Sequence, residues 1–146
     1  MAAEDEIRQA SEQFYAALNR GINGDPGPMM EVWSHGSDVA IMPPSGGIVV
    51  GWEEVRTGWE QAAQTISEGQ VSQDDLVVVP LADDVAYTLS TEHGQVKVGD
   101  EPVRVDWRVT NICRREAGEW KMVHHHTDVS PELVEVFERL EGQQGQ

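Results

Sequence analysis

Residues 102–128 read PVRVDWRVTNICRREAGEWKMVHHHTD. Apolar and polar side chains alternate along both arms of this stretch, and residues 116–119 separate the arms. Alternation with a period of two is typical of strands, and so short a connection favours an antiparallel hairpin. Residues 71–80 and 85–98 carry the same kind of pattern. The second half of the chain is therefore predicted to form a four-stranded antiparallel meander.

The first half of the chain has mainly helical periodicity. Apolar residues share one helical face in residues 4–20 and again in residues 52–66, with acidic residues in each first turn. Smaller elements are expected at residues 28–33 (a helical turn), 38–42 and 48–50 (short strands) and 131–140 (a last helix). Helices that must cover an antiparallel sheet predict an α+β fold with one core. A curved sheet around a long N-terminal helix leaves a cone with an open mouth, which is a natural ligand cavity.

Composition limits the class of protein and its partners. The chain has 146 residues and a formal net charge of -16, which favours a single domain over residues 1–146 with a frayed tail at residues 141–146. A protein this acidic repels phosphate backbones and anionic lipids. Nucleic acid and membranes are therefore not expected partners. The sequence begins without a basic and apolar leader, and a cytoplasmic location is expected.

The densest group of titratable side chains lies in residues 120–128. Unbroken alternation places His124, His126 and Asp128 on one face with Trp120 and Met122, and His125 on the other face. We interpret the pair His124 and His126 as acid/base groups, with Asp128 holding one imidazole in a fixed tautomer. The alternative is a metal site, in which Asp128 or His35 completes a set of ligands. Our prediction is that no metal and no cofactor is bound.

A second group lies on the preceding strand. Asp106, Arg108 and Thr110 share one face, and if that face lines a cavity, Arg108 is suited to bind a carboxylate or an enolate oxygen. The alternative is an ion pair between Arg108 and Asp106 on a wet sheet face. If Arg108 points to solvent, the residues expected to face the pocket are Val109, Asn111 and His125. The further ligand-binding candidates lie in the first half of the chain. These are Tyr15, Trp33 and His35.

The order of elements and several motifs resemble the SnoaL-like branch of the nuclear transport factor 2-like superfamily. This branch includes ketosteroid isomerases, polyketide cyclases and the association domain of calcium/calmodulin-dependent kinase II. The resemblance covers residues 5–128. It rests on residues 14–19 (FYAALN), Trp33-Ser-His35 with Asp38-Val39, Gly46-Gly47 leading to Gly51-Trp52, Arg108-x-Thr110, and Trp120-x-x-Val123-His124-x-His126.

The resemblance implies a ligand pocket inside the cone and a homodimer formed through the convex face of the sheet. That face is expected to expose an apolar stripe of Val105, Trp107 and Val109. The resemblance also argues against one activity. Ketosteroid isomerases use a tyrosine and two acids, whereas Phe14, Pro43 and Thr110 stand at those positions here. Steroid isomerisation by that mechanism is therefore not expected.

The sequence thus predicts a protein that binds a small molecule in a pocket. As an enzyme it would be a cofactor-independent isomerase, cyclase or lyase, in which His124 or His126 moves protons and Arg108 stabilises an oxyanion. Two alternatives stay open at this point. One is a non-catalytic module for ligand binding or oligomerisation, and the other is a metal-dependent enzyme built on the His-x-His strand.

Overall fold

The structure is a computed structural model and describes residues 2–144. Its elements follow the order expected from the sequence. They are α1 (Ala3–Gly21), α2 (Gly27–Val32), β1 (Ala40–Met42), β2 (Val49–Val50), α3 (Trp52–Thr65), β3 (Ile66–Ala82), β4 (Val85–Val98), β5 (Glu101–Glu116), β6 (Glu119–Thr127) and α4 (Pro131–Gln144). The last helix continues four residues beyond its expected end at Leu140, and residues 145 and 146 of the predicted tail lie outside the described residues.

The strands form one six-stranded sheet in the order β2-β1-β6-β5-β4-β3. Strands β3 to β6 are antiparallel neighbours, which confirms the predicted meander. Strand β1 joins the edge of this meander parallel to β6, with Ala40 opposite His124. Gly94 allows β4 to come close to β3, because a Cβ at this position would lie 1.9 Å from the Gln70 carbonyl oxygen.

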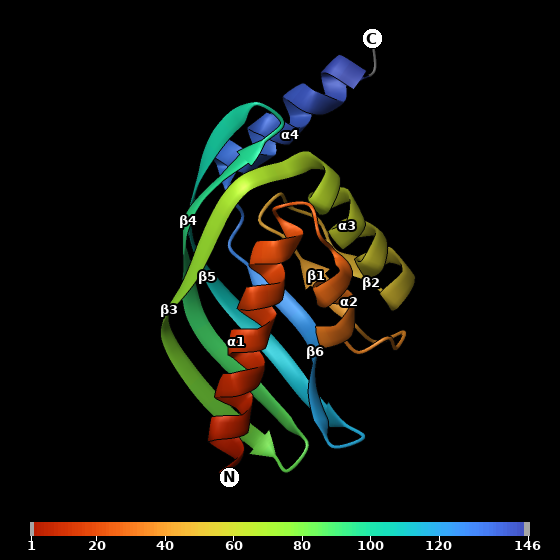
Figure 1. Cartoon of the computed structure of the whole chain (residues 1–146), viewed down its shortest axis with the longest axis vertical. Coiled ribbons are helices and arrows are strands. Elements are labelled where there is room, and N and C mark those ends of the chain that lie inside the picture. Colours follow the sequence, from red (N-terminus) through yellow and green to blue (C-terminus); the bar gives the residue numbers. More distant parts are fainter. Residues whose placement is uncertain (1, 145–146) are drawn as a thin grey trace.

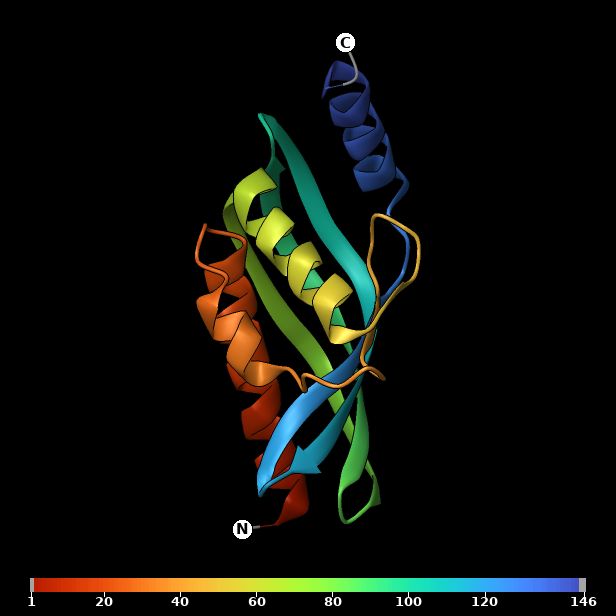
Figure 2. The same ribbon diagram turned by 90° about the vertical axis from the view of Figure 1, so that its right-hand side faces the viewer.

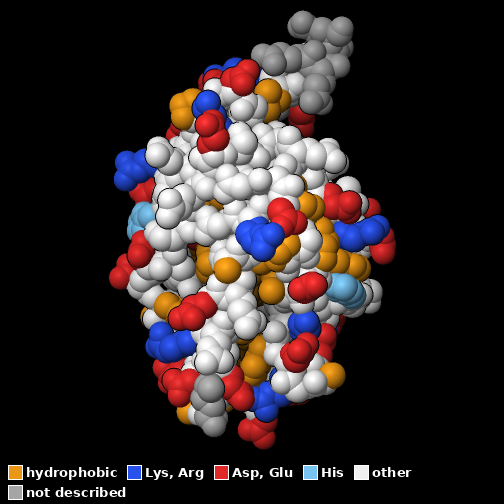
Figure 3. Space-filling model, viewed as in Figure 1, with side chains coloured by type: hydrophobic (Ala, Val, Ile, Leu, Met, Phe, Trp, Pro, Cys, Tyr) orange, Lys and Arg blue, Asp and Glu red, His pale blue; other side chains and the backbone are white. Residues whose placement is uncertain are grey.

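Helices α1, α2 and α3 lie on one side of the curved sheet, and α4 extends from one end (Figure 1 and Figure 2). This arrangement confirms the predicted α+β fold class. Hydrophobic side chains show through near the middle of the helix-covered face, and acidic and basic side chains lie around them (Figure 3). Within residues 2–144, no helix is both long and apolar enough to span a bilayer.

The core fills the space between α1 and the inner face of the sheet. On β5, Val103, Val105, Val109 and Asn111 point inward and are each at most 3% exposed, and the partly buried Trp107 packs against the same core. The expectation that Val105, Trp107 and Val109 form an apolar stripe on the convex face is therefore wrong. These residues alternate with the charged residues of β5, and the charged residues take the outer face because their desolvation is costly.

A β-bulge in β6 changes which histidine points inward. The pairing of β5 and β6 shifts between Ile112 and Cys113, so that Val123 is an extra residue in β6. Met122 and His125 are consequently both buried, although they are three residues apart. The sequence prediction assumed unbroken alternation from Met122 and therefore placed His124 and His126 on the inner face. The bulge reverses this, and His125 is the inward-facing imidazole.

Candidate functional site

The inner face of the sheet holds a buried carboxyl group, that of Glu92 on β4. Glu92 is 3% exposed and accepts two hydrogen bonds. The Tyr15 hydroxyl on α1 donates to Glu92 Oε2 at 2.7 Å, and Trp107 Nε1 on β5 donates to Oε1 at 2.8 Å. Buried carboxyl groups normally have hydrogen-bond donors of this kind on their oxygens. Three elements thus converge on one ionisable group inside the cone.

His125 lies beside this carboxyl group and is 4% exposed. Its Nδ1 contacts Asn111 Oδ1 at 2.6 Å, and its Nε2 lies 3.8 Å from Glu92 Oε2. An amide oxygen can only accept a hydrogen bond, so the Asn111 contact places the imidazole proton on Nδ1. The lone pair on Nε2 is then free to accept a hydrogen bond. It faces the carboxyl group at a distance too long for a hydrogen bond.

Burial controls the ionisation of all three groups. It lowers the pKa of His125 to about 3, so the imidazole is neutral at physiological pH. Burial also raises the pKa of Glu92, and the hydrogen bonds from Tyr15 and Trp107 only partly oppose this. The pKa of Tyr15 is raised first by burial and then by the neighbouring Glu92 carboxylate. The cluster therefore holds a neutral base next to a carboxyl group that retains its proton more readily than usual.

Aromatic rings enclose His125. The rings of Phe14 and Trp59 have their centroids 5.1 and 6.2 Å from the imidazole. Two buried donors in this region, Trp59 Nε1 and Asn111 Nδ2, have no hydrogen-bond partner among the described residues. A cavity of about 20 Å³ lies beside Asn111 and Phe14. It is far smaller than the roughly 300–1,000 Å³ of a typical ligand pocket, and neither His125 nor Glu92 lines it.

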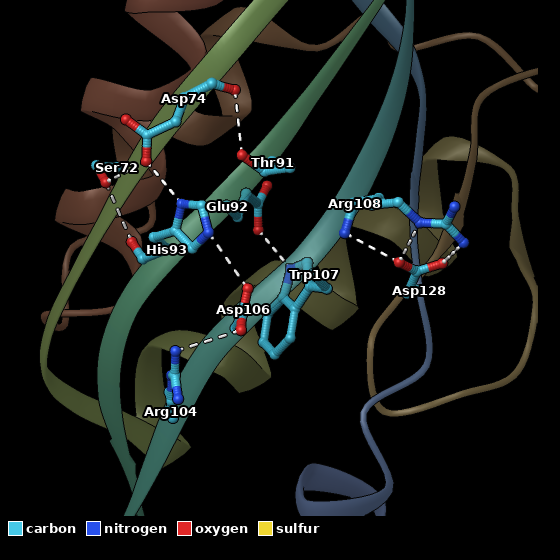
Figure 4. Close-up of polar contacts among 10 residues, drawn as sticks. All are labelled: Ser72, Asp74, Thr91, Glu92, His93, Arg104, Asp106, Trp107, Arg108 and Asp128. Atoms are coloured by element: carbon cyan, nitrogen blue, oxygen red, sulfur yellow. Dashed lines mark hydrogen bonds and ion pairs between the residues drawn. The ribbon is translucent and has the colours of Figure 1, made fainter.

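The outer face holds the residues that the sequence prediction had assigned to the pocket. Arg108, whose side chain is 82% exposed, makes a forked contact with Asp128 at 2.9 and 3.1 Å (Figure 4). His126 is exposed, and its ring centroid is 5.9 Å from that of His124. Arg108, Thr110, His126 and Asp128 do share a groove of about 420 Å³, but this groove is on the outer face. The prediction that they line the cavity under the helices is wrong, because β5 turns its valines inward rather than Arg108 and Thr110, and the bulge in β6 turns His126 outward.

The outer face also carries His93, a histidine with two acidic partners. His93, next to Glu92 on β4, contacts Asp74 through Nδ1 at 2.7 Å and Asp106 through Nε2 at 3.2 Å (Figure 4). The ion pair of Arg108 and Asp106, which was the alternative interpretation, does not form, because Arg108 pairs with Asp128 and Asp106 contacts Arg104 at 3.4 Å. His93 therefore links β3, β4 and β5 on the solvent side.

The remaining predicted residues fall into different places. Tyr15 belongs to the inner cluster, whereas Trp33 is 1% exposed and packs in the core between Phe14 and Trp59. His35 stacks on Trp52 at a centroid distance of 4.1 Å, and its Nε2 contacts the Met30 carbonyl oxygen. In the part of the chain that the structure describes, no three His, Cys, Asp or Glu side chains are placed to share a metal ion.

Sequence reasoning missed Glu92 as a site residue, and it gave Asn111 and His125 only as the pocket-facing residues expected if Arg108 points to solvent, which it does. A signal was present for Glu92, because it continues an alternating inner row of β4 whose other members are small or uncharged, Ala86, Thr88 and Ser90. Asn111 similarly follows the inner valines of β5. No local signal marks the bulge that turns His125 inward.

The comparisons with known proteins agree with this architecture. Residues 7–130 match the model of the SnoaL-like domain. The chain belongs to the SnoaL-like domain family. The resemblance found in the sequence is thereby confirmed. No curated protein matches the chain.

Several solved structures have the same fold as this SnoaL-like chain. A proposed dehydratase of the NTF2-like family from Streptomyces avermitilis is 23% identical, with a TM-score of 0.76 over 87% of this chain and 95% of the other. A proposed calcium/calmodulin-dependent protein kinase type II association domain from Thiobacillus denitrificans is 26% identical, with a TM-score of 0.68 over 84% and 94%. A ketosteroid isomerase-like protein from Erwinia carotovora atroseptica is 20% identical, with a TM-score of 0.72 over 88% and 97%.

Proposed function

We propose that this SnoaL-like protein is an enzyme that moves protons on a small uncharged molecule, as an isomerase, a cyclase or a lyase that eliminates water. The observation that supports this most directly is the state of His125. Its Nδ1 is held by Asn111, and its Nε2 has no hydrogen-bond partner in residues 2–144 and faces the Glu92 carboxyl group. A histidine that only stabilises a fold commonly has both nitrogens engaged by protein groups.

Each residue of the inner cluster has a role in this proposal. His125 Nε2 accepts a proton from the substrate, and Asn111 keeps the imidazole in the tautomer that leaves Nε2 free. In its ionised form Glu92 is near enough to Nε2 to stabilise the imidazolium that forms, which offsets the effect of burial on His125 until the proton returns from Nε2 to the substrate. Tyr15 and Trp107 hold the carboxyl group in place by donating to its two oxygens.

Deuterium exchange tests this proposal with a defined probe. The probe is 1-indanone, a flat uncharged ketone whose α-hydrogens exchange slowly with D₂O in buffer. The expected result is exchange faster than in buffer alone, with a loss of about 10²–10⁴-fold in His125→Gln. His126→Gln is the matched control, since it makes the same change on the outer face of β6. Exchange at the buffer rate in the wild type, or full activity in His125→Gln, contradicts the proposal.

A second candidate function is a non-catalytic association module that pairs two copies of the chain. It is favoured by the outer face, where Val77 and Leu89 are neighbours across β3 and β4 and are 49% and 40% exposed. The groove of about 420 Å³ lies on the same face. A homodimer through this face is compatible with either function, because the inner cluster does not take part in it. The exchange assay therefore separates the two candidates.

A further inference from the structure

A small cavity lies between α1 and the inner face of the sheet, beside the residue that holds His125. Its volume is about 20 Å³, and the buried polar side chains in its wall are Ser11 on α1, Thr88 on β4 and Asn111 on β5. A polar cavity holds a water molecule when it offers more than about 10–15 Å³ and two to four hydrogen-bond partners. This cavity therefore has the size and the polar wall for one water molecule.

Asn111 supplies a donor that needs an acceptor. Its side chain is 3% exposed, and its Nδ2 is buried without a hydrogen-bond partner among the described residues. The other branch of the amide, Oδ1, contacts His125, which does not line the cavity. Nδ2 is thus the branch left for the side of the cavity. An unpaired buried amide donor costs stability, and an oxygen in the cavity would remove that cost.

Ser11 and Thr88 supply the remaining partners. Ser11 Oγ donates to Gln73 Oε1 at 2.8 Å, so its lone pairs remain to accept. The Thr88 hydroxyl can rotate to accept or to donate. Water would accept from Asn111 Nδ2 and donate its two protons to Ser11 and Thr88. No acidic residue lines the cavity in the described part of the chain, so the wall suits a neutral molecule better than a metal cation.

The orientation of the Asn111 amide is coupled to the tautomer of His125. As the amide stands, Oδ1 accepts from Nδ1–H and Nε2 keeps its lone pair. Half a turn of the amide would present Nδ2 to the imidazole, whose Nδ1 would then have to accept, with the proton on Nε2. That turn would also exchange an unpaired N–H for an unpaired carbonyl oxygen, which burial penalises less. Water bound to Nδ2 removes this reason for the amide to turn.

We propose that the cavity binds one water molecule, which accepts from Asn111 Nδ2 and so keeps the proton of His125 on Nδ1. Ser11 and Thr88 are then positioning residues, because they hold the water that holds the amide. The water site follows from the cavity and the unpaired donor alone. Its value to the reaction rests on the proposed function, since only the Nδ1–H tautomer leaves Nε2 as the base.

A high-resolution crystal structure of the wild type tests the site directly. The expected result is an ordered water in the cavity, about 2.7–3.2 Å from Asn111 Nδ2 and within the same reach of Ser11 or Thr88. Tyr15 is the competing acceptor, because its hydroxyl also lies near Asn111. A cavity without ordered water, or a direct hydrogen bond from Nδ2 to Tyr15, overturns the proposal.

Variants of the ¹⁵N-labelled protein test the positioning role, because the shifts of the ring nitrogens of His125 report its tautomer. Ser11→Ala combined with Thr88→Val leaves the water a single partner, and the ratio of the Nε2–H to the Nδ1–H tautomer should rise about tenfold at pH 7. Two controls should keep the wild-type ratio. Thr88→Ser retains the hydroxyl, and Thr110→Val makes the threonine-to-valine change on the outer face of β5.

An unchanged ratio in the double variant, or an equal rise in Thr110→Val, overturns the positioning role. If the double variant does not fold, Thr88→Val alone should raise the ratio about threefold, since the water keeps two of its partners. The absence of any rise in that single variant has the same meaning.

The outcomes separate this inference from the proposed function. If the water is present and the tautomer responds as expected, but the wild type does not accelerate the deuterium exchange of 1-indanone, the water site stands and the catalytic proposal fails. If exchange depends on His125 while the double variant keeps the wild-type tautomer ratio, the catalytic proposal stands and the role of the water is wrong.

Discussion

His125 and His93 lie on opposite faces of the same sheet, and each has a carboxyl group for a neighbour. His125 is enclosed by the helices, and burial lowers its pKa to about 3. His93 lies on the solvent side between Asp74 and Asp106, and its hydrogen bond to Asp74 raises its pKa. Glu92 and His93 are consecutive residues of β4, so one strand supplies both environments. The face that a residue occupies, more than its neighbours in sequence, decides its ionisation.

The largest difference in the free energy of unfolding should come from removing the buried carboxyl group of Glu92 and, separately, the exposed one of Asp106. Glu92→Ala leaves the Tyr15 hydroxyl and the Trp107 N–H without an acceptor. We expect this to lower the free energy of unfolding by about 1–3 kcal/mol for each buried donor that stays unpaired. Asp106→Ala removes an exposed partner of His93 and should cost less than about 1 kcal/mol. Urea denaturation at pH 7 measures both, and equal losses would contradict the distinction between the faces.

The pH dependence of stability should differ in sign between the two histidines. In the folded protein the pKa of His125 lies below the ordinary histidine value of 6.5. The contribution of His125 to stability is therefore complete above pH 6.5 and is lost as the pH falls toward about 3. The uptake of this one proton on unfolding changes the free energy of unfolding by up to about 1.4 kcal/mol per pH unit. The folded pKa of His93 lies above 6.5, so its contribution is complete below pH 6.5 and is lost as the pH rises through the folded pKa.

Two variants measure these slopes separately. Compared with the wild type, His125→Gln should lose less stability between pH 6.5 and pH 4, and His93→Gln should lose less as the pH rises above 6.5. Chemical denaturation at a series of pH values gives both curves. The same change of slope in both variants would show that the two faces do not differ as described.

The smallest effect should come from the apolar part of the outer face. We expect two copies of the chain to pair through this face, which buries Leu89 and Val77. Leu89→Asp should then shift the protein toward monomer without changing its deuterium exchange activity. Sedimentation velocity at moderate salt measures this, since a charge of -16 per chain opposes association at low ionic strength. A wild-type monomer at high concentration would contradict the expectation.

Most of the architecture could be predicted from the sequence because it depends on local patterns. The helical periodicity of residues 4–20 and 52–66 and the alternation of residues 71–128 place the helices and the meander within a few residues. The parallel pairing of β1 with β6 could not be predicted, since it joins segments about eighty residues apart and leaves no periodic signal in a strand of three residues.

The candidate site was predicted less well than the fold, and one extra residue explains much of the difference. The histidine cluster was recognised, but the bulge at Val123 exchanges the faces of His124 and His125. On β5, Arg108 was assigned to the pocket for its chemistry, although the valines on either side of it indicate the buried face. Tyr15 was identified because it lies at the edge of a helical apolar face. Its partner Glu92 is distant in sequence, and only the tertiary structure joins them.

An NMR titration of the histidine side chains in uniformly ¹⁵N-labelled protein measures the state of His125 directly, with His125 assigned by loss of its signals in His125→Gln. We expect His125 to stay neutral, with its proton on Nδ1, from pH 8 down to pH 5. His93 should be protonated over part of the same range. Titration of His125 near pH 6.5, or a proton on Nε2 in the neutral ring, would contradict the central claim that this buried imidazole presents a free base inside the cone.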